Sequence, residues 1–368
     1  MKGRWLQVIY KDMDNIIRVL VVDDSAFNRR ALTKILEEAP NIKVVGTASN
    51  GLDALKEVKN LKPDLVTLDL EMPVMDGFTF LRIQMNRQPV PIIVVSSRDG
   101  SEDIFRALEM GAVDFLPKPT KNISPELFNI RDNLLAKIAA LPHLRLKKMV
   151  NVNSHSLPKI EKSAHKPQKT AYRASDAPDV VAIGTSTGGP RALHHLLSQI
   201  DERLPVSLVI SQHMPAGFTG PFAERLNRDL VMKVKEAKEG DLVEKGEVLI
   251  APGGYNLTFR KTKTGEIKVK LLNKTEKERY TPSVDLMFSS VAEVWDGKIA
   301  GVVLTGMGRD GKKGIVKIKE KGGYTIAESK KTALIFGMPE AAISSGAVDE
   351  VLPLDSIGPK IVGWYKKR

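Results

Sequence analysis

Residues 18–24 read Arg-Val-Leu-Val-Val-Asp-Asp, a short apolar run that ends in two carboxylates. Two further apolar runs follow at residues 65–68 and 92–95. Runs of this length without polar alternation are typical of parallel strands that are buried on both faces. Residues 26–38 and 51–58 lie between the first two runs and have apolar side chains at helical spacing. Strands and helices that alternate in this way predict a doubly wound parallel sheet.

The same alternation begins again in the second half of the chain. Its predicted core strands are residues 180–183, 206–210, 248–251 and 299–304. Residues 255–260 and 266–272 alternate in polarity around Thr264-Gly265, which predicts an antiparallel hairpin. The fold class is therefore α/β, with two doubly wound, mainly parallel-sheet domains, the second of which carries a β-hairpin insertion.

We predict four parts along the chain. They are an N-terminal extension (1–15), a first domain (16–140), a linker (141–178) and a second domain (179–368). Ser124 and Pro125 are residue types that favour the start of a helix, so residues 124–140 are expected to close the first domain as a helix.

The positive charge of the chain is unevenly distributed. The formal net charge is +12, which by itself suggests a nucleic-acid partner. Residues 143–178 hold eight Lys or Arg residues against two acidic ones, so this segment carries half of that charge. It is also rich in Pro, Ser, Ala and Asn and has no apolar periodicity. We therefore interpret it as a basic flexible linker and expect no nucleic-acid partner.

The composition also bears on the compartment. The chain has no Cys, which excludes disulfides, a thiolate nucleophile and Cys-ligated zinc. No apolar run is long enough for a membrane span, and residues 1–15 lack the features of a secretory signal. We expect a cytoplasmic protein that does not insert into a membrane.

Three carboxylates are expected at one edge of the first sheet. Asp23 and Asp24 follow the first apolar run, and Asp69 follows the second. The carboxyl ends of parallel strands meet in one crevice, where three carboxylates repel one another unless a cation is present. Mg²⁺ fits because it prefers oxygen ligands. Ser96 and Lys118 follow two further strands and would suit a phosphoryl group.

This first domain resembles the receiver domain of bacterial response regulators over residues 16–140. The motifs that carry the resemblance are VVDDS (21–25), LDLEMPVMDG (68–77), VVSS (94–97) and DFLPKP (114–119). The resemblance implies that Asp69 accepts a phosphoryl group from a histidine kinase. Ser96 and Lys118 would contact this group, and Phe115 matches the switch aromatic residue of the family.

The resemblance also implies a magnesium site. Asp24, Asp69 and the backbone carbonyl of Glu71 would hold the ion, with Asp23 assisting. Oxygen ligands of these kinds are those that Mg²⁺ takes in proteins. We expect Mg²⁺ to be the cofactor for phosphorylation of this domain.

A Gly-Thr-Ser-Thr-Gly motif opens the second domain at residues 184–188. It directly follows the predicted strand 180–183 and precedes a helical stretch at residues 190–197. A sharp turn from strand to helix exposes a serine hydroxyl at the carboxyl edge of the sheet. The motif alone is weak, because glycine-rich turns also bind phosphate or only reverse the chain. Ser186 is the candidate nucleophile.

His213 is the candidate base. The sequence has six His, and three of them lie in or next to the linker, namely His143, His155 and His165. His194 and His195 follow Ser186 on its own helix, about 12 Å along the axis, and are interpreted as surface or packing residues. His213 follows the predicted strand 206–210 and so reaches the same sheet edge as Ser186.

Two aspartates could orient His213. Asp310 follows the predicted strand 299–304 and reaches that edge. Asp285 opens a helical run that ends near Trp295, where an interaction with the helix dipole is the simpler explanation. We favour Asp310. The resulting order of Ser, His and Asp differs from that of α/β-hydrolases, and no His follows His213, so that class is excluded.

The second domain resembles the catalytic domain of the CheB family of chemotaxis protein-glutamate methylesterases over about residues 180–354. The motifs occur in the order of the family: GTSTGGP (184–190), QHMP (212–215), APGG (251–254), TPSVDLMF (281–288), LTGMGRDG (304–311) and FGMPEAAISSGAVDEVLPL (336–354). The resemblance implies a Rossmann-like domain with Ser186 as nucleophile, His213 as base and Asp310 as its orienting acid. The backbone N–H of Met307 would help to bind the oxyanion.

The implied function is that of a phosphorylation-activated serine esterase in chemotaxis adaptation. It would remove methyl groups from methyl-glutamate residues on the cytoplasmic helices of chemoreceptors and deamidate receptor glutamines. A chemotaxis histidine kinase is the implied phosphodonor, and no cofactor is expected for the ester chemistry. One departure from the family is Thr281, where Arg commonly precedes Pro-Ser-Val-Asp, so a substrate contact there is in doubt.

Two other functions fit parts of the sequence. A response regulator with a DNA-binding output would need a helix-turn-helix in residues 179–368, where glycine-rich loops follow buried strands instead. A non-catalytic, phosphorylation-dependent binding module would not need Ser186, His213 and Asp310 together. We therefore favour the esterase.

Overall fold

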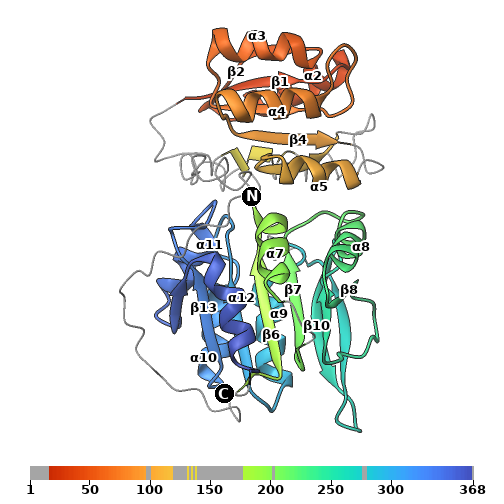
Figure 1. Ribbon diagram of the computed structural model, residues 1–368, viewed down its shortest axis with the longest axis vertical. Helices are drawn as coiled ribbons and strands as arrows, with labels where there is room; N and C mark the ends of the chain where they lie inside the picture. The colour runs from red at the N-terminus through yellow and green to blue at the C-terminus, as the bar shows by residue number, and fades with distance from the viewer. Residues whose placement is uncertain are drawn as a thin grey trace. The chain divides into compact units, whose positions relative to one another are not determined.

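The computed structural model describes residues 16–96, 101–118, 131, 134, 135, 137, 138, 177–200, 204–275 and 280–366. The chain divides into two compact units, Met1–Lys147 and Lys148–Arg368 (Figure 1). Each unit has its own sheet and its own apolar core. The predicted extension at residues 1–15 and the predicted linker up to residue 176 lie outside the described residues.

The first unit is built on a parallel sheet of five strands in the order β2-β1-β3-β4-β5. The strands are β1 (Ile17–Val22), β2 (Ile42–Ala48), β3 (Leu65–Leu68), β4 (Ile92–Ser96) and β5 (Asp114–Pro117). The helices are α2 (Ala26–Glu37), α3 (Gly51–Leu61), α4 (Gly77–Arg87) and α5 (Ser101–Glu109). The doubly wound parallel sheet predicted for this part of the chain is confirmed.

Short polar side chains cap the start of α2, α3 and α4 in this unit. Ser25 accepts a hydrogen bond from Asn28 N, Asn50 from Asp53 N, and Asp76 from Thr79 N. Such caps satisfy backbone N–H groups that the first helical turn leaves unpaired. The predicted helix at 124–140 lies mostly outside the described residues. Within this range the structure describes residues 131, 134, 135, 137 and 138, and all of them are helical.

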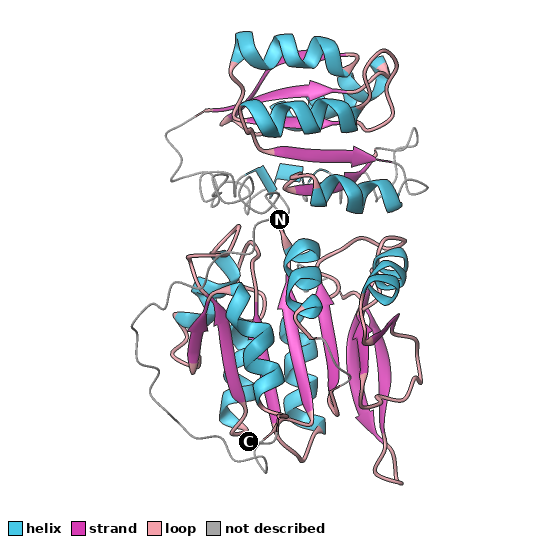
Figure 2. Cartoon of the chain, viewed as in Figure 1, coloured by secondary structure: helices cyan, strands magenta, loops and turns pink. Residues whose placement is uncertain are grey.

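The second unit is built on a parallel sheet of seven strands in the order β14-β13-β12-β6-β7-β9-β8, with helices on both faces (Figure 2). The strands are β6 (Val180–Thr185), β7 (Ser207–Gln212), β8 (Lys233–Glu236), β9 (Glu247–Ile250), β12 (Ile299–Val303), β13 (Tyr324–Glu328) and β14 (Glu350–Leu352). The helices are α7 (Gly189–Ser198), α8 (Thr219–Asp229), α9 (Val284–Val294), α10 (Lys312–Glu320), α11 (Gly337–Ile343) and α12 (Leu354–Gly363).

The predicted hairpin is a separate two-stranded antiparallel sheet of β10 (Tyr255–Lys261) and β11 (Ile267–Asn273). Gly265 lies in its turn with a φ of 88°, a conformation that glycine adopts without strain. The apolar helix α9 packs on β10, on β6 and on α10. Its close approach to β6 depends on Gly184, where a Cβ atom would lie 2.1 Å from Val284 Cγ1.

Candidate functional site

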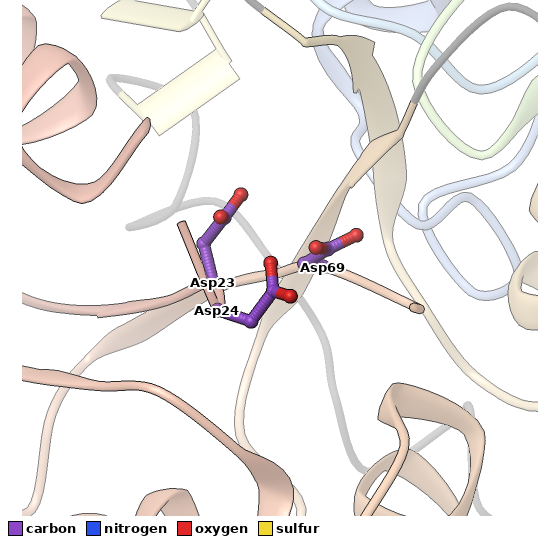
Figure 3. A group of neighbouring side chains, drawn as sticks. All are labelled: Asp23, Asp24 and Asp69. Atoms are coloured by element: carbon purple, nitrogen blue, oxygen red, sulfur yellow. The ribbon is translucent and has the colours of Figure 1, made fainter. Parts of the chain in front are cut away.

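The three predicted carboxylates meet at the carboxyl edge of the first sheet. Because β1 and β3 are neighbours, Asp23 and Asp24 after β1 lie beside Asp69 after β3 (Figure 3). One carboxylate oxygen from each residue lies within 4.8 Å of the others. Asp23 and Asp69 are buried and Asp24 is exposed. Three carboxylates this close together can supply oxygen ligands to a hard divalent cation.

Lys118 supplies a positive charge to this cluster. Its Nζ atom lies 2.6 Å from Asp69 Oδ2 and 3.8 Å from Asp23 Oδ2. Burial raises the pKa of Asp69 to about 6, against the lowering effect of Lys118. Burial also raises the pKa of Asp23. A further positive charge would therefore stabilise the ionised carboxylates of this cluster, as the predicted magnesium site requires.

Ser96, Phe115 and Glu71 surround this cluster on neighbouring elements. Ser96 ends β4 and is buried, and its carbonyl accepts a hydrogen bond from Lys118 N at 2.8 Å. Phe115 is a buried residue of β5 that pairs with Val94. Glu71 N lies 3.3 Å from Asp69 Oδ1, so the turn after β3 folds back over the carboxylate. Sequence reasoning missed Asn28, whose Nδ2 atom donates to both oxygens of Asp23 at 3.2 Å.

The Ser186 turn lies at the carboxyl edge of the second sheet, between β6 and α7. Ser186 N donates to Thr305 O at 3.0 Å, and Gly189 N donates to Ser186 O at 2.7 Å. Gly188 turns the chain into the helix with a φ of 78°. Ser186 is largely buried, with 9% of its surface exposed. The backbone on both sides of this serine is therefore fixed.

His213 lies next to this turn because β7 is the neighbour of β6. Thr185 pairs with Gln212 in the register of the two strands, and His213 N donates to Thr185 O at 3.1 Å. The Nε2 atom of His213 lies 2.8 Å from Asp310 Oδ2. Its Nδ1 atom is buried and has no hydrogen-bond partner among the described residues. The structure thus brings His213 and Asp310 together and leaves the second ring nitrogen for another group.

The carboxylate of Asp310 accepts hydrogen bonds from the N-terminus of α9. Val284 N donates to Oδ2 at 2.8 Å, and Asp285 N donates to Oδ1 at 2.9 Å. The hydroxyl of Ser283, the N-cap of α9, donates to Oδ1 at 3.2 Å. Burial alone would raise the pKa of Asp310, but the hydrogen bonds from His213 and from the α9 backbone outweigh it and lower the pKa. Asp310 is therefore ionised at neutral pH.

This charge state determines the tautomer of His213. A carboxylate can only accept hydrogen bonds, so the Nε2 atom beside Asp310 must carry the proton. In a neutral imidazole the Nδ1 atom then has the lone pair and can accept a proton. The geometry can therefore support a base that acts through Nδ1.

The other candidates from the sequence lie elsewhere. Asp285 accepts a hydrogen bond from Gly314 N at 2.7 Å and so binds the start of α10. His194 and His195 are partly exposed and pair with Asp229 at 3.4 Å and with Asp355 at 2.6 Å. None of these interactions involves Ser186 or His213.

Met307 lies in the loop that follows β12, against the Ser186 turn. A Cβ atom on its neighbour Gly306 would lie 2.8 Å from Ser186 Cβ, so this loop and the serine are in close contact. Gly308, on its other side, has a φ of 91°. Met307 is therefore held between two glycines next to the candidate nucleophile.

Known proteins resemble this chain along almost its whole length. A family model described as CheB methylesterase matches residues 181–361, and one described as response regulator receiver domain matches residues 19–125. Protein-glutamate methylesterase/protein-glutamine glutaminase 3 of Geobacter sulfurreducens is 48% identical over 360 residues, which cover 94% of this chain and 96% of the relative.

The chain belongs to the CheB methylesterase family.

Further relatives of this CheB-family chain include the protein-glutamate methylesterase/protein-glutamine glutaminase of Halalkalibacterium halodurans. It is 43% identical over 360 residues, which cover 96% of this chain and 100% of the relative. The crystal structure of the Thermotoga maritima CheB methylesterase catalytic domain is 40% identical, covers 51% of this chain and 98% of that chain, and has a TM-score of 0.49. The match to a CheB catalytic domain at residues 181–361 argues against the alternative of a DNA-binding output.

Sequence reasoning about this CheB chain missed two sets of contacts that fix the catalytic edge. Gln212 Nε2 donates to Ser186 O at 3.1 Å and to His213 O at 3.0 Å. The α9 N-terminus binds Asp310, and the only sequence signal for it was the N-cap type of Ser283 in Pro-Ser-Val-Asp.

In the part of the chain that the structure describes, no helix is both long and apolar enough to cross a membrane.

Proposed function

We propose that this chain is a receiver-regulated serine esterase that hydrolyses glutamate methyl esters on chemoreceptor helices and deamidates receptor glutamines. The pair formed by His213 and Asp310 beside the Ser186 turn is the observation that carries this proposal. It lies in a domain whose relatives are named protein-glutamate methylesterase/protein-glutamine glutaminase. The site of action is the cytoplasmic side of the membrane, where the receptor helices and the kinase lie.

Ser186 is the nucleophile and His213 its base. His213 Nδ1 takes the proton of the hydroxyl while Oγ bonds to the ester carbonyl carbon. The backbone N–H of Met307 binds the oxyanion, since the loop that carries it touches Ser186. When the tetrahedral intermediate collapses, methoxide leaves and takes the proton from His213 as methanol.

Water then completes the reaction. His213 removes a proton from a water molecule, which attacks the acyl-enzyme, and returns that proton to Ser186 Oγ as glutamate leaves. Deamidation follows the same course with ammonia as the first leaving group. Asp310 holds the Nε2 proton throughout and stabilises the imidazolium that forms in each half-reaction.

In the receiver unit, Asp69 accepts the phosphoryl group from a chemotaxis histidine kinase. Asp23, Asp24, Asp69 and the carbonyl of Glu71 would hold Mg²⁺, which supplies charge neutralisation for phosphoryl transfer when bound. Lys118 releases Asp69 Oδ2 and pairs with a phosphoryl oxygen. The hydroxyl of Ser96 binds another phosphoryl oxygen, and Phe115 on the next strand changes its position in response.

Methanol release from methylated chemoreceptor membranes tests the proposal. Ser186→Ala should lower the rate by at least a thousandfold, because no other hydroxyl replaces the nucleophile. Ser198→Ala, at the exposed end of helix α7 that follows the Ser186 turn, is the matched control and should keep the wild-type rate. A Ser186→Ala protein that retains a tenth of the wild-type rate would refute the assignment.

A further inference from the structure

Tyr280 lies on the face of the candidate base. The rings of His213 and Tyr280 are stacked, with centroids 4.4 Å apart and planes inclined by 8°. Tyr280 is half-buried and lies in the segment that leads into the α9 N-cap, Ser283. Asp310 therefore binds the edge of the imidazole, and Tyr280 covers one of its faces.

The same tyrosine also reaches the loop that carries Met307. A Cβ atom at Gly308 would lie 2.7 Å from Tyr280 Oη, so only a residue without a side chain leaves room for the phenol there. Gly308 also has a φ of 91°, which glycine adopts readily. One side chain thus contacts both the base and the neighbour of the proposed oxyanion donor.

We propose that Tyr280 is a positioning residue for the ester hydrolysis, whose ring holds the plane of His213 and stabilises its imidazolium form. This inference rests on the proposed function. A positive ring within about 6 Å of an aromatic centroid is attracted to the negative π face. A neutral imidazole gains much less from that face, and His213 becomes charged only when it takes the Ser186 proton. The stacking therefore favours the transition state over the ground state.

The charged groups around His213 do not change when this ring is removed. Asp310 lies on Nε2, and Asp285 lies behind Asp310, bound to the start of α10. Besides Asp310, the ionisable side chain that contacts the imidazole among the described residues is that of Tyr280. A change in the pH dependence of a Tyr280 variant therefore reports on the stacked ring.

Tyr280→Phe keeps the π face, and Tyr280→Leu keeps apolar bulk without it. In the full-length protein, we expect Tyr280→Phe to keep kcat within about threefold of the wild type. Tyr280→Leu should lower kcat by roughly 3- to 30-fold with little change in KM. The acid limb of its kcat/KM profile should also move to lower pH, because the protonated imidazole has lost a stabilising contact.

Methanol release from methylated receptor membranes is measured for each variant between pH 5 and pH 9, which includes the range of about pH 5 to 8 in which histidine side chains usually titrate. Thermal unfolding shows whether each variant folds, and Tyr280→Met replaces Tyr280→Leu if the latter does not. Wild-type kinetics in the ring-free variant would overturn the inference. So would a fall in kcat without a shift of the acid limb, or an equal loss in Tyr280→Phe. Absence of Ser186-dependent hydrolysis in the wild type would instead refute the proposed function.

Discussion

At the scale of single residues, the side chain of Gln212 connects the Ser186 turn with His213. Its amide nitrogen donates to the carbonyls of Ser186 and His213, which directly follow the neighbouring strands β6 and β7. It is almost fully buried, and its Oε1 atom lies where a Cβ atom of residue 189 would be. Gly189 therefore makes room for the glutamine that fixes the distance between nucleophile and base.

Gln212→Glu tests this role, because it keeps the shape of the side chain and replaces the donor with an acceptor. Two backbone carbonyls would then face a carboxylate oxygen, and the Ser186 turn would shift. We expect kcat/KM to fall by about 10- to 100-fold, since small misplacements of reacting groups have effects of this size. Gln88→Glu, on the exposed end of α4, is the control. Equal activity of Gln212→Glu and Gln88→Glu would show that this amide is dispensable.

A second residue-scale prediction concerns the charge of Asp310. Its pKa is lowered in the folded protein, so its ionisation stabilises the fold above the unfolded value of about 3.9. This stability is lost as the pH falls through the lower, folded pKa. Asp310→Asn should therefore reduce the free energy of unfolding by about 3 kcal/mol at pH 7. The difference between wild type and variant should stay constant down to about pH 5 and shrink below pH 4.

Urea unfolding followed by tryptophan fluorescence measures this difference. Two of the three tryptophans, Trp295 and Trp364, are described in the second unit, so the signal reports mainly on the unit that contains Asp310. Asp349→Asn, a carboxylate of the same unit paired with Lys319, is the control. A difference that persists unchanged to pH 3 would contradict the prediction.

Much of the residue-scale picture could be predicted from the sequence, and part of it could not. The G-x-S-x-G motif and the elimination of other histidines directed attention to Ser186 and His213, which directly follow the neighbouring strands β6 and β7. The contacts of Gln212 and of the α9 N-terminus could not be predicted, because they join side chains to backbone groups. Backbone donors and acceptors are present at every position, so residue type alone does not show which side chain they bind.

At the scale of elements, the contact between α9 and α10 holds the α9 N-terminus, whose backbone N–H groups donate to the Asp310 carboxylate. Gly314 lies at this contact, where a Cβ atom would be 2.5 Å from Phe288 Cβ and 3.1 Å from Asp285 O. Its backbone N–H also donates to the Asp285 carboxylate. A side chain at this position would therefore separate the two helices and weaken that hydrogen bond.

Gly314→Ala should reduce the free energy of unfolding by about 1–3 kcal/mol, the usual cost of overpacking a core. Gly363→Ala is the matched control in helix α12, because a Cβ atom there meets nothing within 4 Å. The control should be neutral or stabilising by up to about 1 kcal/mol, since alanine favours helix over glycine. Urea unfolding of both variants measures the effects. Equal stabilities would show that α9 moves to make room for the added methyl group at this contact.

The elements that the sequence predicted best are the central strands of each sheet. Residues 65–68 form β3 with the predicted bounds, and the strands at 180–183 and 299–304 are β6 and β12. The edge strands β2, β8 and β14 were missed, and so was β13, which lies between β14 and β12. Half-exposed strands such as β2 mix polar and apolar residues without a long apolar run, so their pairing is decided by neighbours that lie far away in the sequence.

At the scale of the whole molecule, the phosphoacceptor and the esterase groups lie in different units. The described groups that contact His213 and Asp310 in these interactions belong to the second unit. We therefore expect the ester chemistry itself to proceed without phosphorylation. The hypothesis that follows is that the unphosphorylated receiver restricts access of a bulky receptor substrate, at the high effective concentration that a covalent connection provides.

The protein truncated to residues 179–368 should then be more active than the unphosphorylated full-length chain. Full-length Asp69→Asn should keep the basal rate and gain nothing from a phosphodonor, since its phosphoacceptor is absent. Methanol release with and without a phosphodonor measures both effects, and Asp64→Asn in the same unit is the control. A truncated protein no faster than its unphosphorylated parent would rule out restriction of access.

The two apolar cores share no residue, and this has a calorimetric consequence. Cores that melt separately give two endotherms, so no single melting temperature describes such a chain. Magnesium together with beryllofluoride, a phosphoryl mimic, is expected to bind at Asp69 and so to raise the endotherm of the first core by mass action. The size of any accompanying shift in the second endotherm then measures, in kelvin, how strongly the regulatory half and the hydrolytic half are coupled.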